Sequence, residues 1–120
     1  MMNRRRYWVA LVAGFLIGAQ AWSADLDLSA CAFPDAPDLP DGSSASMEEI
    51  STSGGAVRAY VTAMEGQLAC LDTKRDGLGE EITSDQLTMI NSAYNSGVDS
   101  LNAVAGAYNE AVRAYKARTQ

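Results

Sequence analysis

The sequence predicts an all-α protein: an antiparallel two-helix hairpin with a coiled-coil-like seam and an extended N-terminal arm that a disulfide ties back onto the first helix. Two long segments without proline each carry apolar or small residues at alternating steps of three and four, which is the period of an α-helix. The turn-forming segment RDGLGEEIT joins them. The cysteines, Cys31 and Cys70, lie where a disulfide can connect the arm to the first helix.

Residues 1–21 have the pattern of a signal peptide. Three arginines at positions 4–6 precede an apolar stretch, and Ala19-Gln20-Ala21 supplies the small residues at which signal peptidase cuts. We expect cleavage before Trp22, with a cut after Ser23 or Ala24 as the alternative. The charge-free run 7–24 is shorter than the roughly 20 apolar residues of a transmembrane helix. The sequence therefore predicts a periplasmic or secreted protein with no transmembrane segment in the mature chain.

The mature chain is strongly acidic. The 120 residues include nine basic and 15 acidic ones, and three of the basic residues belong to the signal peptide, so six remain against 15 and the mature net charge is −9. Nucleic acids and anionic lipids are bound mainly through Lys and Arg, so we expect neither as a partner. About 99 mature residues make one domain at most.

Residues 22–45 are predicted to form the arm. Pro34, Pro37 and Pro40 recur at a spacing of three, which favours a polyproline II path over a helix. The helical hairpin is expected over residues 46–117.

The first helix is predicted over about 46–75. Ser46 and Glu49 form a capping box at its start, Arg75 suits the dipole of its last turn, and Gly77 is the expected C-terminal cap. Its seam consists of Met47, Ile50, Gly54, Val57, Val61, Met64, Leu68 and Leu71.

The second helix is predicted over about 84–117, after a turn at 76–83. Thr83 and Gln86 form a second capping box. Its seam consists of Leu87, Ile90, Tyr94, Gly97, Leu101, Val104, Tyr108, Ala111 and Tyr115.

Folding the helices back with the shortest loop places Gly97 opposite Val61 and Gly54 opposite Val104. A hairpin of this kind packs like a coiled coil but buries one face of each helix only. Its stability is therefore marginal, and a disulfide, the arm or a second copy is expected to lock it.

Export makes a Cys31–Cys70 disulfide the expected state of the two cysteines. Cys70 lies about 36 Å along the first helix at 1.5 Å per residue, and the 15 residues from Cys31 to Ser46 span about 46 Å at 3.1 Å per residue, so the arm can double back far enough. A lipoprotein lipidated at Cys31 is one alternative, since Leu28-Ser29-Ala30-Cys31 matches a lipobox in its letters. A free thiol is the other.

A line of small residues is the expected track for the returning arm on the first helix, and the alternative is that alanine simply favours a helix there. The track consists of Gly55, Ala56, Ala59, Ala63, Gly66 and Ala69.

The sequence offers little for catalysis or metal binding. It contains no histidine, so it has neither an imidazole base nor an ordinary zinc site. The run from Asp72 to Gly77 is similar to the start of an EF-hand loop, but Lys74 and Thr83 stand where calcium ligands are required. We therefore predict no catalytic residue, cofactor or metal.

One flank of the second helix is the candidate contact surface for a partner. Three asparagines recur every seven residues beside the seam, and two valines widen the apolar stripe. A second copy completing a four-helix bundle would explain this width, and so would the arm or a bend of the seam. We call this surface the Tyr/Asn flank; it consists of Tyr94, Asn95, Val98, Asn102, Tyr108, Asn109 and Val112.

The order of these landmarks resembles that of uncharacterised small exported (periplasmic) helical-hairpin proteins of proteobacteria. The resemblance rests on the signal peptide, Cys31, the arm, Met47, Tyr60, Leu68-Ala69-Cys70, Tyr94-Asn95, Tyr108-Asn109 and Ala114-Tyr115-Lys116. It implies a location and a fold and carries no established activity.

The expected function is that of a structural or protein-interaction module of the cell envelope, without catalytic activity, whose partner is another protein or a second copy of the chain. A small-ligand binder or an enzyme with a site formed between subunits is the competing class.

Overall fold

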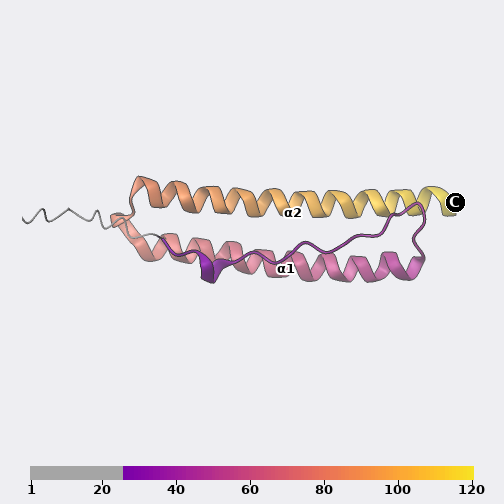
Figure 1. Ribbon diagram of the computed structural model, residues 1–120, viewed down its shortest axis with the longest axis horizontal. Coiled ribbons are helices and arrows are strands. Elements are labelled where there is room, and N and C mark those ends of the chain that lie inside the picture. Colours follow the sequence, from indigo (N-terminus) through magenta and orange to yellow (C-terminus); the bar gives the residue numbers. More distant parts are fainter. Residues whose placement is uncertain (1–25) are drawn as a thin grey trace, which may run out of the picture.

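The computed structural model describes residues 26–120, and over that range it confirms the all-helical hairpin (Figure 1). The elements are a short 3₁₀ helix η1 (Ser29–Cys31), helix α1 (Met47–Leu78), a 3₁₀ turn η2 (Gly79–Glu81) and helix α2 (Ser84–Thr119). No strand occurs among these residues. With 32 and 36 residues, α1 and α2 are about 48 and 54 Å long. The predicted signal peptide and its cleavage site before Trp22 lie outside the described residues.

Both predicted capping boxes are present. At the start of α1, the Glu49 amide donates to the Ser46 hydroxyl oxygen at 3.1 Å, and the Ser46 amide donates to the Glu49 carboxylate at 2.8 Å. Thr83 and Gln86 repeat the arrangement at the start of α2, at 3.1 and 3.0 Å. Each box satisfies two backbone N–H groups that the first turn of a helix leaves unpaired.

The first helix is longer than predicted. It continues to Leu78, so Gly77 lies inside it and the prediction of Gly77 as the cap is wrong. Gly79 ends the helix instead, with a positive φ of 57°, and its amide donates to the Asp76 carbonyl. Glycine adopts this backbone conformation without a steric penalty. The second helix also continues two residues beyond its predicted end, to Thr119.

The longer first helix changes how the two helices are aligned. A side chain built at Gly54 would meet Tyr108, and one at Gly97 would meet Leu68, where Val104 and Val61 were predicted. Moving the reversal to 79–83 shifts α2 along α1 by about one helical turn. The predicted alignment is therefore wrong. Most of the predicted seam residues lie in or against the core, which also contains Tyr60, a residue outside the predicted seam.

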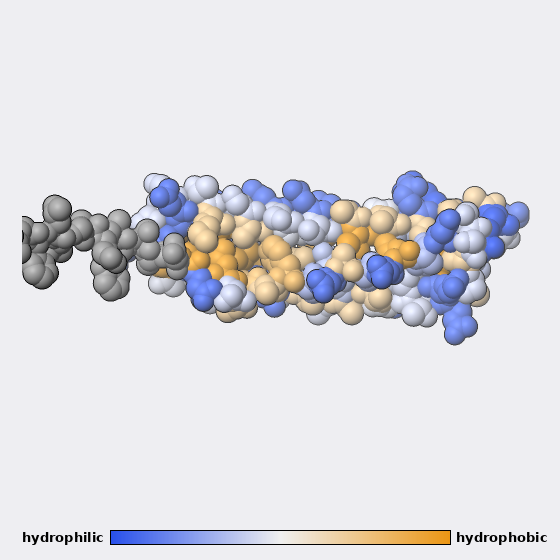
Figure 2. Space-filling model, viewed as in Figure 1, coloured by the Kyte–Doolittle hydropathy of each residue, from blue (hydrophilic) through white to orange (hydrophobic). Residues whose placement is uncertain are grey.

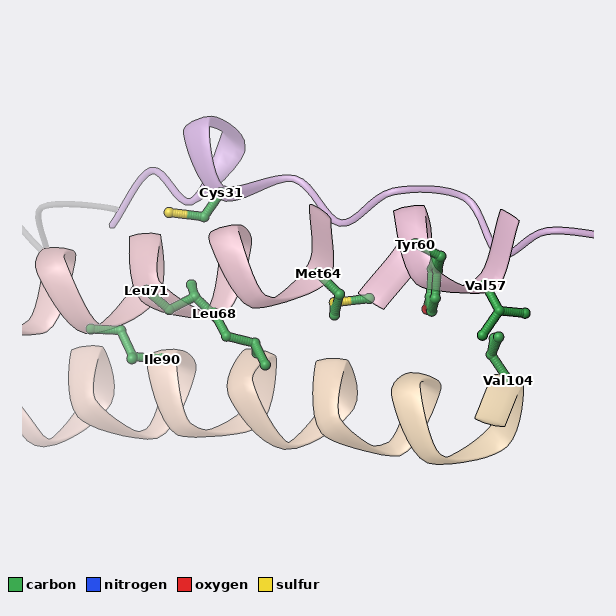
Figure 3. Close-up of a cluster of buried hydrophobic side chains, with 8 residues drawn as sticks. All are labelled: Cys31, Val57, Tyr60, Met64, Leu68, Leu71, Ile90 and Val104. Carbon is green, nitrogen blue, oxygen red and sulfur yellow. The ribbon is translucent and has the colours of Figure 1, made fainter. Parts of the chain in front are cut away.

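The core lies between the helices and under the arm (Figure 3). Its main cluster consists of Cys31, Val57, Tyr60, Met64, Leu68, Leu71, Ile90 and Val104. A second, smaller cluster of Ala45, Ile50 and Ala111 closes the end where α1 begins and α2 finishes. Met47 and Leu87 were predicted as seam residues, but both lie at the start of a helix and are exposed.

From η1, which lies on α1, the arm crosses the groove between the helices and reaches the C-terminal part of α2 before it turns back to the start of α1 (Figure 1). Phe33 packs into the notch at Gly97, and Gly42 lies directly on the Ala111 carbonyl of α2. On the face shown in Figure 2, hydrophobic surface gathers mainly towards the end of the hairpin where α1 turns into α2. The arm is thus a third layer of the fold that contacts both helices.

The predicted track of small residues does not carry the arm. Side chains built at Gly55 and Gly66 would meet nothing within 4 Å, and Ala59, Ala63 and Ala69 are exposed. The groove is the better site because there the apolar side chains of the arm reach the seam of both helices. Of the track residues, Ala56 lies beside the arm residues Leu39 and Pro40.

Candidate functional site

The Cys31–Cys70 disulfide is present and fixes the start of the arm to α1, with the two Cα atoms 5.5 Å apart. Cys31 is buried and belongs to the main core cluster. Because its sulfur is bonded to Cys70, it is not free to carry a lipid thioether or to act as a thiol. The disulfide prediction is confirmed, and the predictions of a lipidated or free Cys31 do not agree with this structure.

The other end of the arm is held by polar contacts with α2. The Arg118 side chain donates from Nε to the Gly42 carbonyl at 3.2 Å and lies over the ring of Tyr115, 5.3 Å from its centre. Just beyond, the Asp41 carboxylate accepts hydrogen bonds from the amide and hydroxyl of Ser43, at 2.9 and 2.7 Å, which lower its pKa. These bonds shape the turn that leads the chain from the groove into α1.

A similar hydrogen bond between an aspartate and a serine two residues later lies just before η1. The Ser29 amide donates to the Asp27 carboxylate at 2.9 Å, and hydrogen bonding to Ser29 lowers the pKa of that carboxyl. Lys74 adds a smaller electrostatic effect in the same direction. The acidic residues Asp27 and Asp41 therefore have a structural use within the arm.

The Tyr/Asn flank divides into inner and outer residues. Tyr94, Val98 and Tyr108 are partly buried against the main core cluster, and Val112 packs against the smaller one. The outer residues, which are all exposed, are Asn95, Asn102 and Asn109. The valines that widen the stripe thus have contacts within the chain.

A polar hollow of about 450 Å³ lies at one end of the flank, between the end of α1 and the start of α2. It is lined by Asp72, Arg75, Asn91, Tyr94 and Asn95. Arg75 donates to the Asp72 carboxylate at 2.9 Å, and each of these two side chains is 43% exposed. The structure thus brings the predicted Tyr94 and Asn95 together with three residues that were not among the predicted contact residues.

Sequence reasoning missed these three residues because it placed the two helices in a different alignment. Asp72 and Arg75 were interpreted through the helix dipole and the EF-hand pattern, and Asn91 lies outside the heptad line of the other asparagines. The sequence could have indicated them only through the alignment of the two helices, and that alignment depends on where the first helix ends.

Two further hollows flank the arm. One of about 470 Å³ lies between the arm and the first turns of α1, and one of about 510 Å³ adjoins Cys70, Lys74 and Leu78. Within residues 26–120, no group of three or more potential ligand side chains gathers to hold a metal ion. In the same part of the chain, no helix combines the length and apolarity needed to cross a bilayer.

No known protein family, curated protein or solved structure matches this chain. The similarity to small exported proteins of proteobacteria therefore stays a prediction. The assignment of a function rests on the residues and geometry of the chain itself.

Proposed function

We propose that this chain is an exported protein of the bacterial cell envelope, periplasmic or secreted, that acts as a structural or protein-interaction module without catalytic activity. Export is supported by the signal-like residues 1–21 and by the Cys31–Cys70 disulfide, since disulfides persist in oxidising compartments. The disulfide fixes one end of an arm that packs on both helices, and this arrangement suits a module that presents a surface to a partner.

The observation that carries the interaction role is the exposed line of Asn95, Asn102 and Asn109. The three amides recur once per heptad beside a packed seam, so they project from a stiff helix along one line. Carboxamides both donate and accept hydrogen bonds, and a rigid row of them loses little entropy on binding. The partner is another protein or a second copy of the chain.

A site-specific photo-crosslinker tests this proposal. Placed at Asn102 in the oxidised protein within intact cells, it is expected to give one defined product. The matched control is Ala103, which is also exposed but points about 100° further around the helix. Mass spectrometry of the product distinguishes a self-crosslink from another protein. Equal crosslinking from both positions, or none from Asn102, would contradict the proposed surface.

A further inference from the structure

The polar hollow at the end of the Tyr/Asn flank combines charged, amide and aromatic residues. Asp72 and Arg75 of α1 and Asn91, Tyr94 and Asn95 of α2 line a space of about 450 Å³. The charges are bonded to each other at 2.9 Å, so the hollow carries no net charge. Asn91 and Asn95 lie one helical turn apart and are both exposed.

The backbone that carries the walls of the hollow is anchored on both helices. Tyr94 is partly buried against the main core cluster, which limits the movement of its ring. Asp72 follows the disulfide-bonded Cys70 by two residues, and Asn91 adjoins Ile90, one of the most deeply buried side chains. A site on rigid elements pays little entropy to order its contacts.

The combination of groups selects the chemistry of a ligand. Because Asp72 and Arg75 neutralise each other, the hollow offers no net charge to attract a cation or an anion. A neutral ligand rich in hydroxyl groups suits it better, because each hydroxyl both donates and accepts, as do the two amides. The Tyr94 ring adds an apolar surface with a polar edge, on which the C–H face of a sugar ring can pack.

We propose that this hollow binds a short neutral oligosaccharide, with Asn91 and Asn95 pairing its hydroxyl or acetamido groups and the Asp72–Arg75 pair flanking them. In ligand sites a small number of polar groups fixes the orientation of the ligand, and here the two asparagines would have that part. The inference rests on the proposed function, since the hollow is one end of the same flank, and it gives the partner surface a glycan-binding end.

The test uses the oxidised chain from Trp22 to Gln120, labelled with ¹⁵N and titrated with triacetylchitotriose and, separately, with cellotriose. The expected result is a set of amide shifts confined to residues around Asp72, Arg75 and 91–95. Stronger binding of triacetylchitotriose indicates that the acetamido group is recognised, and equal binding of both indicates recognition of hydroxyls.

Two variants separate the site from the rest of the surface. Asn95→Ala is expected to weaken binding by about threefold or more, in line with one lost hydrogen bond. Asn109→Ala is the matched control, because Asn109 follows Tyr108 as Asn95 follows Tyr94 but lies outside the hollow, and it is expected to leave binding unchanged.

The inference is overturned if neither sugar shifts the amides around the hollow at millimolar concentration, or if both variants bind equally. In that case a defined crosslink from Asn102 would still support the interaction module. Failure of the crosslink together with the titration would remove both proposals.

Discussion

Gly42 is the position where a single methyl group is expected to displace the C-terminal end of the arm from α2. A Cβ added there would collide with the Ala111 carbonyl oxygen and would lie 2.7 and 2.8 Å from the carbonyl carbon and Cα of the same residue. All three atoms belong to the backbone of α2, so no change of side-chain rotamer relieves the contact. The positive φ among the described glycines belongs to Gly79, so Gly42→Ala introduces a steric clash without backbone strain.

The expected loss of stability has three contributions. Overpacking a tight contact costs about 1–3 kcal/mol. Lifting the backbone also removes the hydrogen bond from Arg118 to the Gly42 carbonyl, worth about 1 kcal/mol. Alanine in place of glycine also lowers the conformational entropy of the unfolded chain, which stabilises the folded state by about 0.5 kcal/mol. The net loss is about 2.5 kcal/mol, which for a domain of this size lowers Tm by roughly 10–20 °C.

The assay is thermal unfolding followed by circular dichroism at 222 nm, with the disulfide intact. Gly66→Ala is the control, because Gly66 is exposed within α1 and a Cβ there would meet nothing within 4 Å. Alanine favours a helix over glycine by about 0.5–1 kcal/mol, so this variant is expected to raise Tm by a few degrees. If Gly42→Ala also raised Tm, or left it unchanged, the close packing of the arm on α2 would be refuted.

Three further outcomes are expected. Replacing Cys31 and Cys70 by serine lowers the free energy of unfolding by about 4 kcal/mol on the chain-entropy model, measured by urea titration, and a loss below about 1 kcal/mol would contradict the clamp. Thr83→Ala costs about 1 kcal/mol by the same assay, because it removes an N-cap, and an unchanged midpoint would argue against the capping box. Hydrogen bonds from Ser43 lower the folded pKa of Asp41, so the stability it contributes is present above its ordinary pKa of 3.8 and is lost as the pH falls through the lower folded value. Carboxyl NMR titration checks this, and an Asp41 pKa at or above 3.8 would contradict it.

The sequence was sufficient for those features that depend on local chemistry. Both capping boxes, the helical seams and the Cys31–Cys70 disulfide were predicted because each rests on a short pattern or on a pair whose alternatives are few. The end of α1 was harder to predict, since Gly77 and Gly79 offer equally good caps by residue type. That difference of two residues is enough to change which side chains meet across the seam.

The polar hollow shows how such a shift spreads to the candidate site. With the predicted alignment, Leu71 pairs with Leu87, so Asp72 and Arg75 lie opposite the first residues of the second helix. In the structure α1 continues to Leu78 and α2 is shifted along it, so Asp72 and Arg75 line one hollow with Asn91 and Asn95. A site formed between two helices can therefore be predicted only when the alignment of the helices is predicted correctly.

The path of the arm was predicted wrongly because it depends on contacts with both helices, which the pattern of one helix does not show. A run of small residues on one helix was interpreted as a track, but a backbone gains little from lying on a bare helix surface. The notch that matters joins two helices: Gly97 of α2 makes room for Phe33 beside Leu68 of α1. Because Phe33 completes the core there, the disulfide holds in place a layer that packing also favours, so the arm is as much a part of the fold as either helix.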